Sequence, residues 1–319
     1  MSPLFEIHSV TKRFRQHAAL DNVSLRGERG QVIALLGENG AGKTTLLKIL
    51  LGLLAPDGGS SRVLGLDSQT HGAEIRRRVG YMPDRPALYE WMTVCEIGWF
   101  AAGFYPLGYQ DRYEEIVQKF SLPDRPIKSL SKGMQGKVSL ALAMAHEPEL
   151  LVLDEPTSGL DPLVRREFLE SMIEIASEGR TVLLSSHQIA EVERVADVVA
   201  ILRGGKLILC EPLEVLKDRV SEVIVTLNDI ETAPPKVASP ALLLRAQRHD
   251  RVWRLMVRDL DDAGRIALNS EPNHLHVEEK RLSLEEIFVT CMTTKADGFD
   301  PLTIGSPPRD TALASAKRA

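Results

Sequence analysis

The chain has 319 residues, of which 44% are hydrophobic and 26% charged, and its formal net charge is −5. This length predicts about two domains, and the composition is typical of a soluble globular protein and not of a disordered or fibrous one. Because the charge is weakly negative and no basic stripe occurs, we expect no nucleic-acid partner.

Cysteine usage and hydropathy limit the classes further. Cys95, Cys210 and Cys291 are far apart and lack C-x-x-C spacing, which indicates neither a disulfide framework nor a zinc site. The first residues, MSPLFEIHSVTKRF, lack the apolar core of a signal peptide, and no run reaches the roughly 18 to 20 apolar residues of a membrane span. We therefore expect a cytoplasmic chain without a membrane segment of its own.

Residues 4 to 30 alternate apolar and polar positions. This alternation predicts antiparallel strands, closed by turns such as Glu28-Arg29-Gly30. Phe14 lies within this segment and has two interpretations: its ring stacks on a nucleotide base, or it packs in the core.

The next signal is a strand followed by a glycine-rich loop. The apolar run VIALL (32–36) predicts a buried parallel strand, and leucines at helical spacing begin at Leu46. Between them, GENGAGKTT matches Gly-x-x-x-x-Gly-Lys-[Ser/Thr]. The pattern predicts a phosphate-binding loop made of Gly37, Glu38, Asn39, Gly40, Ala41, Gly42, Lys43, Thr44 and Thr45.

The chemistry of this loop suits a nucleotide. Glycine lets the backbone adopt positive φ and turn its N–H groups inward, and the following helix adds unpaired donors and the positive end of its dipole. Lys43 adds a mobile positive charge, and Thr44 offers a hydroxyl to the magnesium ion that bridges the β- and γ-phosphates.

Half of the aromatic residues lie in one segment, from Tyr89 to Tyr113. Two interpretations stay open, which are core packing of a helical insert and an exposed patch that docks a partner protein. The residues are Tyr89, Trp91, Trp99, Phe100, Phe104, Tyr105, Tyr109 and Tyr113.

Residues LSKGM (130–134) precede an alanine-rich segment that Pro148 closes. This arrangement predicts a helix with Ser131 as its N-cap, and Gly133 allows close approach of backbone. Exposed N–H groups at such a helix start favour an anion. Taken alone, the pattern is more often that of a simple helix cap.

Two further apolar runs end in polar side chains. LLVLDE (150–155) ends in Asp154 and Glu155, and VLLSSH (182–187) ends in His187. The carboxyl ends of strands in an open α/β sheet form the ligand crevice, so Asp154 and Glu155 belong beside Lys43. His187 can hydrogen-bond a phosphate oxygen or a carboxylate, although a lone histidine is more often structural. One carboxylate can hold magnesium, directly or through water, while the other takes a proton from an attacking water.

In chain order, GENGAGKTT, LSKGM, LLVLDEPTSGLDP and LSSH resemble the Walker A, signature, Walker B with D-loop, and switch-histidine motifs of ABC transporter ATPases. The resemblance covers about residues 4 to 215. It implies an α/β fold, a P-loop ABC ATPase domain with a RecA-like core, an antiparallel β-subdomain and a helical signature subdomain.

The resemblance also implies ATP and Mg2+ as cofactors and gives single residues a role. The roles are Phe14 under adenine, Lys43 and Thr44 at the phosphates and magnesium, Asp154 at magnesium, Glu155 as general base, Asp161 in the D-loop and His187 as sensor of the γ-phosphate.

In the family two such domains pair head to tail, so the signature of one chain closes on ATP held by residues 37–45 of the other. One Walker A motif and no internal repeat therefore imply a homodimer or heterodimer, with a transmembrane permease as a separate chain. The signature residues are Ser131, Lys132, Gly133 and Met134.

Departures from the family pattern carry information. LSKGM replaces the commoner LSGGQ and looks like the branch that serves ABC-2 type exporters. Gly136 stands where that branch usually has glutamine, and a helix-interior glycine costs about 0.5 to 1 kcal/mol relative to alanine. Asp84 stands where the Q-loop glutamine is expected, and two interpretations stay open: it takes part in magnesium binding there, or it starts the turn with Pro83 and Pro86.

The sequence changes character near residue 216. Strand-like runs at 222–227 and 252–257 and a capping box at Ser283 to Glu286 resemble the small α+β appendage of many ABC-2 type ATPases. We expect an ABC ATPase domain over 1–215, an accessory α+β domain over 216–292, and a disordered tail over 293–319.

The leading hypothesis is the ATP-binding and ATP-hydrolysing subunit of an exporter, attached to the cytoplasmic face of the cell membrane through its permease. The alternative, a soluble ABC ATPase of DNA repair or translation, needs long coiled-coil arms, zinc cysteines or a second ATPase half, and the sequence shows none. A P-loop GTPase or kinase leaves the signature and His187 unexplained, and no Asn-Lys-x-Asp guanine reader occurs.

Overall fold

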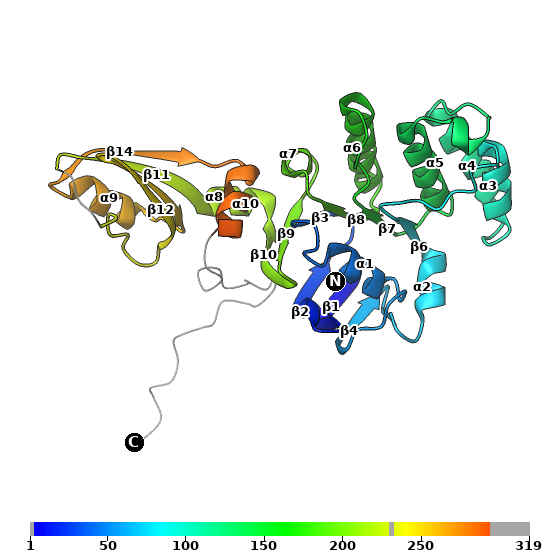
Figure 1. Cartoon of the computed structure of the whole chain (residues 1–319), viewed down its shortest axis with the longest axis horizontal. Helices are drawn as coiled ribbons and strands as arrows, with labels where there is room; N and C mark the ends of the chain where they lie inside the picture. Colours follow the sequence, from blue (N-terminus) through cyan, green and yellow to red (C-terminus); the bar gives the residue numbers. More distant parts are fainter. Residues whose placement is uncertain (1–2, 230–232, 294–319) are drawn as a thin grey trace, which may run out of the picture.

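The computed structural model describes residues 3–229 and 233–293. The structure has three sheets, with the C-terminal sheet at one end of the molecule, helices α3 to α5 at the other and the remaining two sheets between them (Figure 1). The predicted disordered tail lies outside the described residues from residue 294 on, whereas Thr293 is the last residue of a helix.

The central sheet has the strand order β10-β9-β3-β8-β7-β6, and only β10 runs antiparallel to its neighbour. Strands β3, β8 and β7 are buried along their whole length, as expected of parallel strands covered on both faces. The strands are β3 (Val32–Leu36), β6 (Val79–Met82), β7 (Leu150–Asp154), β8 (Thr181–Ser186), β9 (Val198–Arg203) and β10 (Lys206–Pro212).

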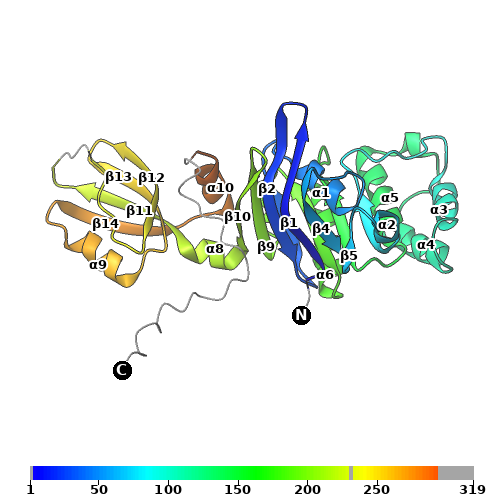
Figure 2. The same ribbon diagram turned by 90° about the horizontal axis from the view of Figure 1, so that it is seen from below.

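A second, antiparallel sheet packs on one face of the central sheet, with the order β2-β1-β4-β5. Its strands are β1 (Phe5–Phe14), β2 (His17–Gly27), β4 (Gly58–Val63) and β5 (Leu66–Asp67). The long β1–β2 hairpin stands out in Figure 2 and ends near Phe14. The alternation of residues 4 to 30 thus predicted β1 and β2 correctly.

Helices cover the rest of the central sheet. α1 (Lys43–Leu50) packs between the two sheets, and α6 (Pro162–Ser177) covers the opposite face. α2 (Gly72–Arg78) precedes β6, and the short α7 (Ile189–Val192) follows β8. The side chains of α6 that enter the core are Phe168, Leu169, Met172 and Ile175.

A helical subdomain, residues 92–145, has its own hydrophobic core. Its elements are α3 (Val94–Ala102), α4 (Tyr109–Lys119), the 3-10 turn η1 (Ile127–Ser129) and α5 (Lys132–Met144). Thr93 and Glu96 form a capping box at α3, and Ser131 caps α5 by accepting from the Met134 N–H at 3.3 Å.

The aromatic segment divides between the two interpretations left open by the sequence. Tyr109 and Tyr113 are buried in the helical subdomain, and the Tyr113 hydroxyl donates to the Val94 carbonyl at 2.8 Å. An exposed set lies outside that core, with edge-to-face ring contacts of 5.4 Å and 5.5 Å within it. This exposed aromatic cluster consists of Tyr89, Trp91, Trp99, Phe100 and Phe104.

The C-terminal sheet has the order β12-β13-β11-β14 and is antiparallel throughout. The predicted domain boundary, between residues 215 and 216, lies within α8, the helix that links β10 to this sheet. The capping box at Ser283 forms as predicted, with Glu286 N–H donating to the Ser283 hydroxyl at 3.3 Å. The elements are α8 (Leu213–Arg219), β11 (Val220–Leu227), β12 (Leu242–His249), β13 (Val252–Arg258), α9 (Asp262–Ser270), β14 (His274–Arg281) and α10 (Leu284–Thr293).

The last helix returns to the central sheet. Leu284, Ile287 and Phe288 of α10 belong to the same buried cluster as α6 and β9, and Arg203 donates to the Cys291 carbonyl at 2.8 Å. The C-terminal sheet is therefore attached to the central sheet twice, by α8, which precedes it in the sequence, and by α10, which follows it.

Candidate nucleotide site

The glycine-rich loop connects β3 to α1 at the carboxyl edge of the central sheet. Gly42 has φ of 108°, and a Cβ atom there would lie 2.4 Å from the Ala19 carbonyl oxygen. A Cβ atom at Gly37 would lie 2.5 Å from the Leu202 carbonyl oxygen. Since both contacts are with backbone, these two positions accept only glycine. No side chain caps the start of α1, so its first backbone N–H groups can bind a ligand.

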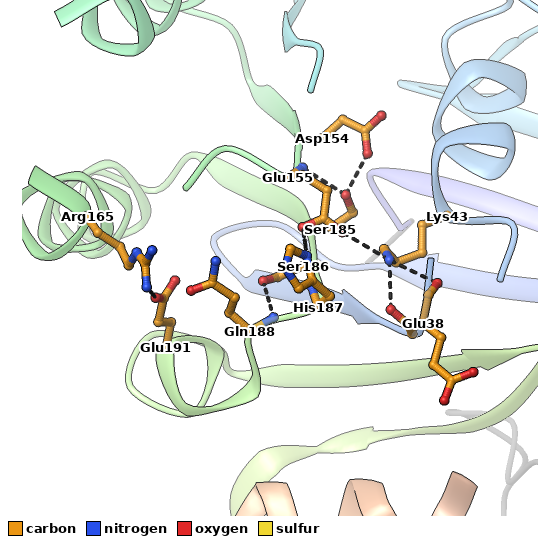
Figure 3. A network of polar contacts seen from close by, with 11 residues as sticks. Glu38, Lys43, Asp154, Glu155, Arg165, Ser185, Ser186, His187, Gln188 and Glu191 are labelled. Carbon is orange, nitrogen blue, oxygen red and sulfur yellow. Dashed lines mark hydrogen bonds and ion pairs between the residues drawn. The ribbon is translucent and has the colours of Figure 1, made fainter. Parts of the chain in front are cut away.

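Lys43, the first residue of α1, is buried at the centre of the site. Its Nζ donates to the carbonyl oxygens of Gly37 at 2.7 Å and Glu38 at 3.3 Å, and lies 3.0 Å from Glu155 Oε1 (Figure 3). The ammonium group therefore faces the hollow of the loop, where the phosphates of a nucleotide would bind.

Glu155 follows β7 directly and contacts two of the predicted residues. Its other oxygen, Oε2, lies 2.7 Å from His187 Nδ1 and 3.3 Å from the His187 backbone N–H. A carboxylate only accepts, so the proton of this hydrogen bond belongs to Nδ1. Glu155 has φ of 49°, a strained value for a non-glycine residue, and such strain is concentrated at functional sites.

Asp154 and Glu155 are held by a residue to which sequence reasoning gave no role. The hydroxyl of Ser185, at the end of β8, donates to Asp154 Oδ1 at 2.6 Å and accepts from the Glu155 N–H at 3.0 Å. Ser185 and Asp154 are fully buried. The signal in the sequence was a serine that interrupts an apolar run two residues before His187.

Asp84 follows β6 and is exposed, with its carboxylate 4.0 Å from Arg85. It lines a cavity of about 390 Å³ together with Glu155 and Lys132. Burial raises the pKa of Tyr81 to about 12, and the negative charges of Asp154 and Asp84 add to this rise. The carboxylates of Asp154 and Asp84 therefore both lie close enough to the Tyr81 hydroxyl to affect its pKa.

The signature residues lie at the start of α5. A Cβ atom at Gly133 would lie 2.9 Å from Val164 of α6, so this glycine allows packing between two helices of one chain. The Lys132 ammonium lies against Gly159, within 2.2 Å of where a Cβ atom there would stand. Within the described residues, no hydrogen bond or ion pair joins Ser131 to the loop 37–42.

Phe14 and Asp161 make no described contact with Lys43 or Glu155. Phe14 is half-exposed at the end of β1, with Lys12 Nζ 5.6 Å from its ring centroid, so it is not a core residue. Asp161 caps α6, where its carboxylate accepts from the backbone N–H groups of Leu163 and Val164 at 3.2 Å and 3.1 Å. Its described contacts are those of a helix cap.

The donor set suits magnesium brought in with a nucleotide. Hydroxyl and carboxylate oxygens, from Thr44, Asp154 and Asp84, are the hard ligands that Mg2+ prefers, and Asp154 is a buried carboxylate with a single hydroxyl donor. In the described part of the chain, no three His, Cys, Asp or Glu side chains gather into a metal site. Phosphate oxygens would therefore supply part of the coordination.

Comparisons with known proteins match this geometry. The family described as ABC transporter matches residues 20–158. An uncharacterized ABC transporter ATP-binding protein of Bacillus subtilis, YxlF, is 37% identical over 231 residues, which are 70% of this chain and 76% of that protein. The chain belongs to the ABC transporter ATP-binding proteins. It therefore binds ATP and is an ATPase, since this family hydrolyses ATP to power transport.

Two further similarities define the extent of this ABC ATPase. A solved ATP-binding subunit of an ABC transporter is 33% identical, with a TM-score of 0.62 over 67% of this chain and 92% of that one. The Escherichia coli protein YbhF, named a probable multidrug ABC transporter ATP-binding protein, is 36% identical over 211 residues, which are 64% of this chain but only 36% of YbhF. The predicted fold class is confirmed.

No helix among the described residues of this ABC ATPase combines the length and the apolar character that crossing a bilayer requires.

Proposed function

We propose that this ABC ATPase is the energy-supplying subunit of an exporter and drives a separate transmembrane permease. The observation that carries the proposal is the position of the exposed aromatic cluster. Asp84 and Leu88 line the cavity that contains Glu155, and Tyr89 of the cluster follows at once. A partner bound on the aromatic rings would thus contact the chain segment that reaches the hydrolytic carboxylate.

Glu155 is the general base of the proposed reaction, and its carboxylate takes the proton of the attacking water. His187 holds the carboxylate in orientation through the 2.7 Å contact at Nδ1 and senses the γ-phosphate. Lys43 neutralises the phosphates, and Thr44, Asp154 and Asp84 would hold Mg2+ there. When bound, the metal supplies positive charge for the leaving phosphate.

Two chains pair head to tail in this proposal, as a homodimer or heterodimer. Ser131 and Gly133 of one chain then close on ATP at residues 37–45 of the other, with Asp161 at the same interface and Phe14 under the adenine. Ser131 and Lys132 are exposed at the start of α5, and the ring of Phe14 is half-exposed, which supports this arrangement.

The proposed division assigns residues 1–215 to the ATPase and 216–292 to an accessory domain. The chain binds at the cytoplasmic face of the cell membrane through the permease. Export is supported by the signature LSKGM and by the similarity to YbhF, a probable multidrug ABC transporter ATP-binding protein.

The test is to purify the tagged chain from detergent extracts and to reconstitute what co-purifies in vesicles. We expect one integral membrane protein in a fixed ratio, and ATP hydrolysis that rises when it is present. A chain that purifies only with soluble partners, and whose ATPase rate no membrane protein changes, would contradict the proposal.

A further inference from the structure

Two loops meet at the hydrolytic carboxylate. We name residues 155–161 the carboxylate loop and residues 186–191 the histidine loop. They are joined at one end by Glu155 Oε2, which contacts both Nδ1 and the backbone N–H of His187. The orientation of Glu155 therefore depends on where the histidine loop lies.

The same two loops are joined a second time, at their far ends. Arg165, in the first turns of α6, donates from Nη2 to the Leu160 carbonyl at 2.9 Å, and its Nη1 lies 2.7 Å from Glu191 Oε1. Figure 3 shows Arg165 and Glu191 facing each other on the side of the histidine loop remote from Lys43. The two connections close a ring of contacts.

Burial distinguishes this pair from an ordinary surface ion pair. The side chains of Arg165 and Glu191 are 26% and 15% exposed, whereas those of the neighbouring pair Arg166 and Glu170 are 64% and 58% exposed. Exposed pairs contribute little because water and salt screen them, and partly buried pairs are screened much less. Two consecutive arginines of α6 therefore differ: the ion pair of Arg165 is shielded from solvent, and the ion pair of Arg166 is exposed to it.

We propose that Arg165 and Glu191 are positioning residues for ATP hydrolysis. By holding the Leu160 carbonyl and the start of α7 together, they fix the histidine loop, and through it the contact of His187 with Glu155. Neither residue touches the reacting atoms. The inference rests on the proposed roles of Glu155 and His187.

A positioning role and a purely stabilising role differ in kinetics. Misplacing a catalytic group by a fraction of an ångström lowers turnover strongly, while ATP held by Lys43 and the loop 37–42 binds as before. We therefore expect Arg165→Gln and Glu191→Gln each to lower kcat about tenfold and to change KM for ATP by less than about twofold. The matched control Arg166→Gln should leave both constants unchanged.

Two more variants of the full chain test the pairing itself. Because the two side chains act as one unit, the kcat of the double variant Arg165→Gln/Glu191→Gln should be no lower than that of the less active single variant. Arg165→Lys should recover part of kcat, since an ammonium can make one of the two contacts but not both. Additive losses in the double variant would show that the two residues act separately and would overturn the proposal.

A readout independent of activity is hydrogen exchange of the peptide covering residues 186–195. We expect faster exchange there in Arg165→Gln than in wild type, with no change in the peptide covering β11 and none in Arg166→Gln. Equal exchange and equal kcat in Arg165→Gln and Arg166→Gln would overturn the proposal. These assays use hydrolysis and exchange of the chain alone, so failure to find a permease would leave their outcome unaffected.

Discussion

Lys43 and Glu155 form an ion pair of 3.0 Å whose side chains are only 6% and 13% exposed. The cation of the phosphate loop is therefore already neutralised by the carboxylate that follows β7. A bound triphosphate must share Lys43 with this carboxylate and also brings negative charge close to it. The charge of Glu155 opposes ATP binding, although the proposed hydrolysis needs the same carboxylate.

Substitutions of Glu155 and of Lys43 should therefore change the affinity for ATP in opposite directions. Glu155→Gln removes a competing negative charge and should tighten binding of a non-hydrolysable ATP analogue about threefold to tenfold, whereas Lys43→Ala should weaken it at least tenfold. Isothermal titration calorimetry measures both, with the exposed Glu174→Gln as control. Weaker binding by Glu155→Gln would show that the ion pair prepares the site and does not compete for it.

Asp84 should affect the magnesium dependence of hydrolysis. It shares a cavity with Glu155, and its oxygens suit a hard cation. Asp84→Ala should raise the magnesium concentration for half-maximal ATPase activity several-fold and weaken stimulation by the membrane subunit, with a smaller loss of nucleotide affinity than in Lys43→Ala. Asp84→Gln should restore part of the loss.

Magnesium titrations of ATPase, with and without the membrane subunit, are the measurement for Asp84. Glu90→Ala is the matched control, because it removes an exposed carboxylate from the same loop. Identical titration curves for Asp84→Ala and wild type would leave Asp84 as a turn residue beside Pro83 and Pro86.

The exposed aromatic cluster should contribute to binding of the permease. Tyr89→Ala combined with Trp91→Ala should weaken the free energy of binding to the permease by at least about 2 kcal/mol, because aromatic side chains dominate binding at such surfaces. Less permease should then co-purify, while basal ATPase activity is unchanged. Ile266→Ala combined with Leu275→Ala, which changes two exposed apolar residues of α9 and β14, is the control. Loss of folding or basal activity in the aromatic variant would instead make the cluster structural.

The junction with the C-terminal sheet should lose stability in acid. Hydrogen bonds from Arg219 hold the pKa of Asp259 below its usual value, with a smaller opposing effect from burial. The folded chain therefore binds this proton less readily than the unfolded chain. Ionised Asp259 stabilises the fold above the unfolded pKa of about 3.9, and this contribution is lost as pH falls through the lower folded value.

Asp259→Asn should accordingly lower the melting temperature at pH 7 by about 2 to 4 °C, and the difference from wild type should shrink below about pH 4. Thermal unfolding followed by circular dichroism measures this. Asp262→Asn, whose side chain is 95% exposed, is the control. A difference that grows in acid would refute the sign of the argument.

Local pattern was sufficient to predict much of the fold. β3, β7 and β8 are buried apolar runs, and the loop that follows β3 is set by consecutive residues, so the strand-loop-helix unit could be predicted without knowing any long-range contact. The aromatic segment could not be resolved in the same way. Whether Tyr113 or Trp99 is buried depends on the faces of α3 and α4 that meet, which nearest-neighbour sequence does not determine.

The contacts around Glu155 were predictable only in part. The positions of Asp154, Glu155 and His187 follow from strands that end at one edge of the sheet. The roles of Ser185 and Arg165 depend on β8 lying next to β7 and on α6 packing beside α7, which are tertiary facts. Such residues carry no motif because their spacing in the sequence is set by the lengths of the intervening elements.

Glu155 is the proposed base of an ATPase that closes as a dimer on ATP. Glu155→Gln keeps the shape and an acceptor oxygen but cannot take the proton. We predict that it lowers turnover by at least about a hundredfold and that, with ATP and magnesium, it elutes from a sizing column as a dimer that wild type forms only briefly. Hydrolysis at the wild-type rate by Glu155→Gln would exclude Glu155 as the base.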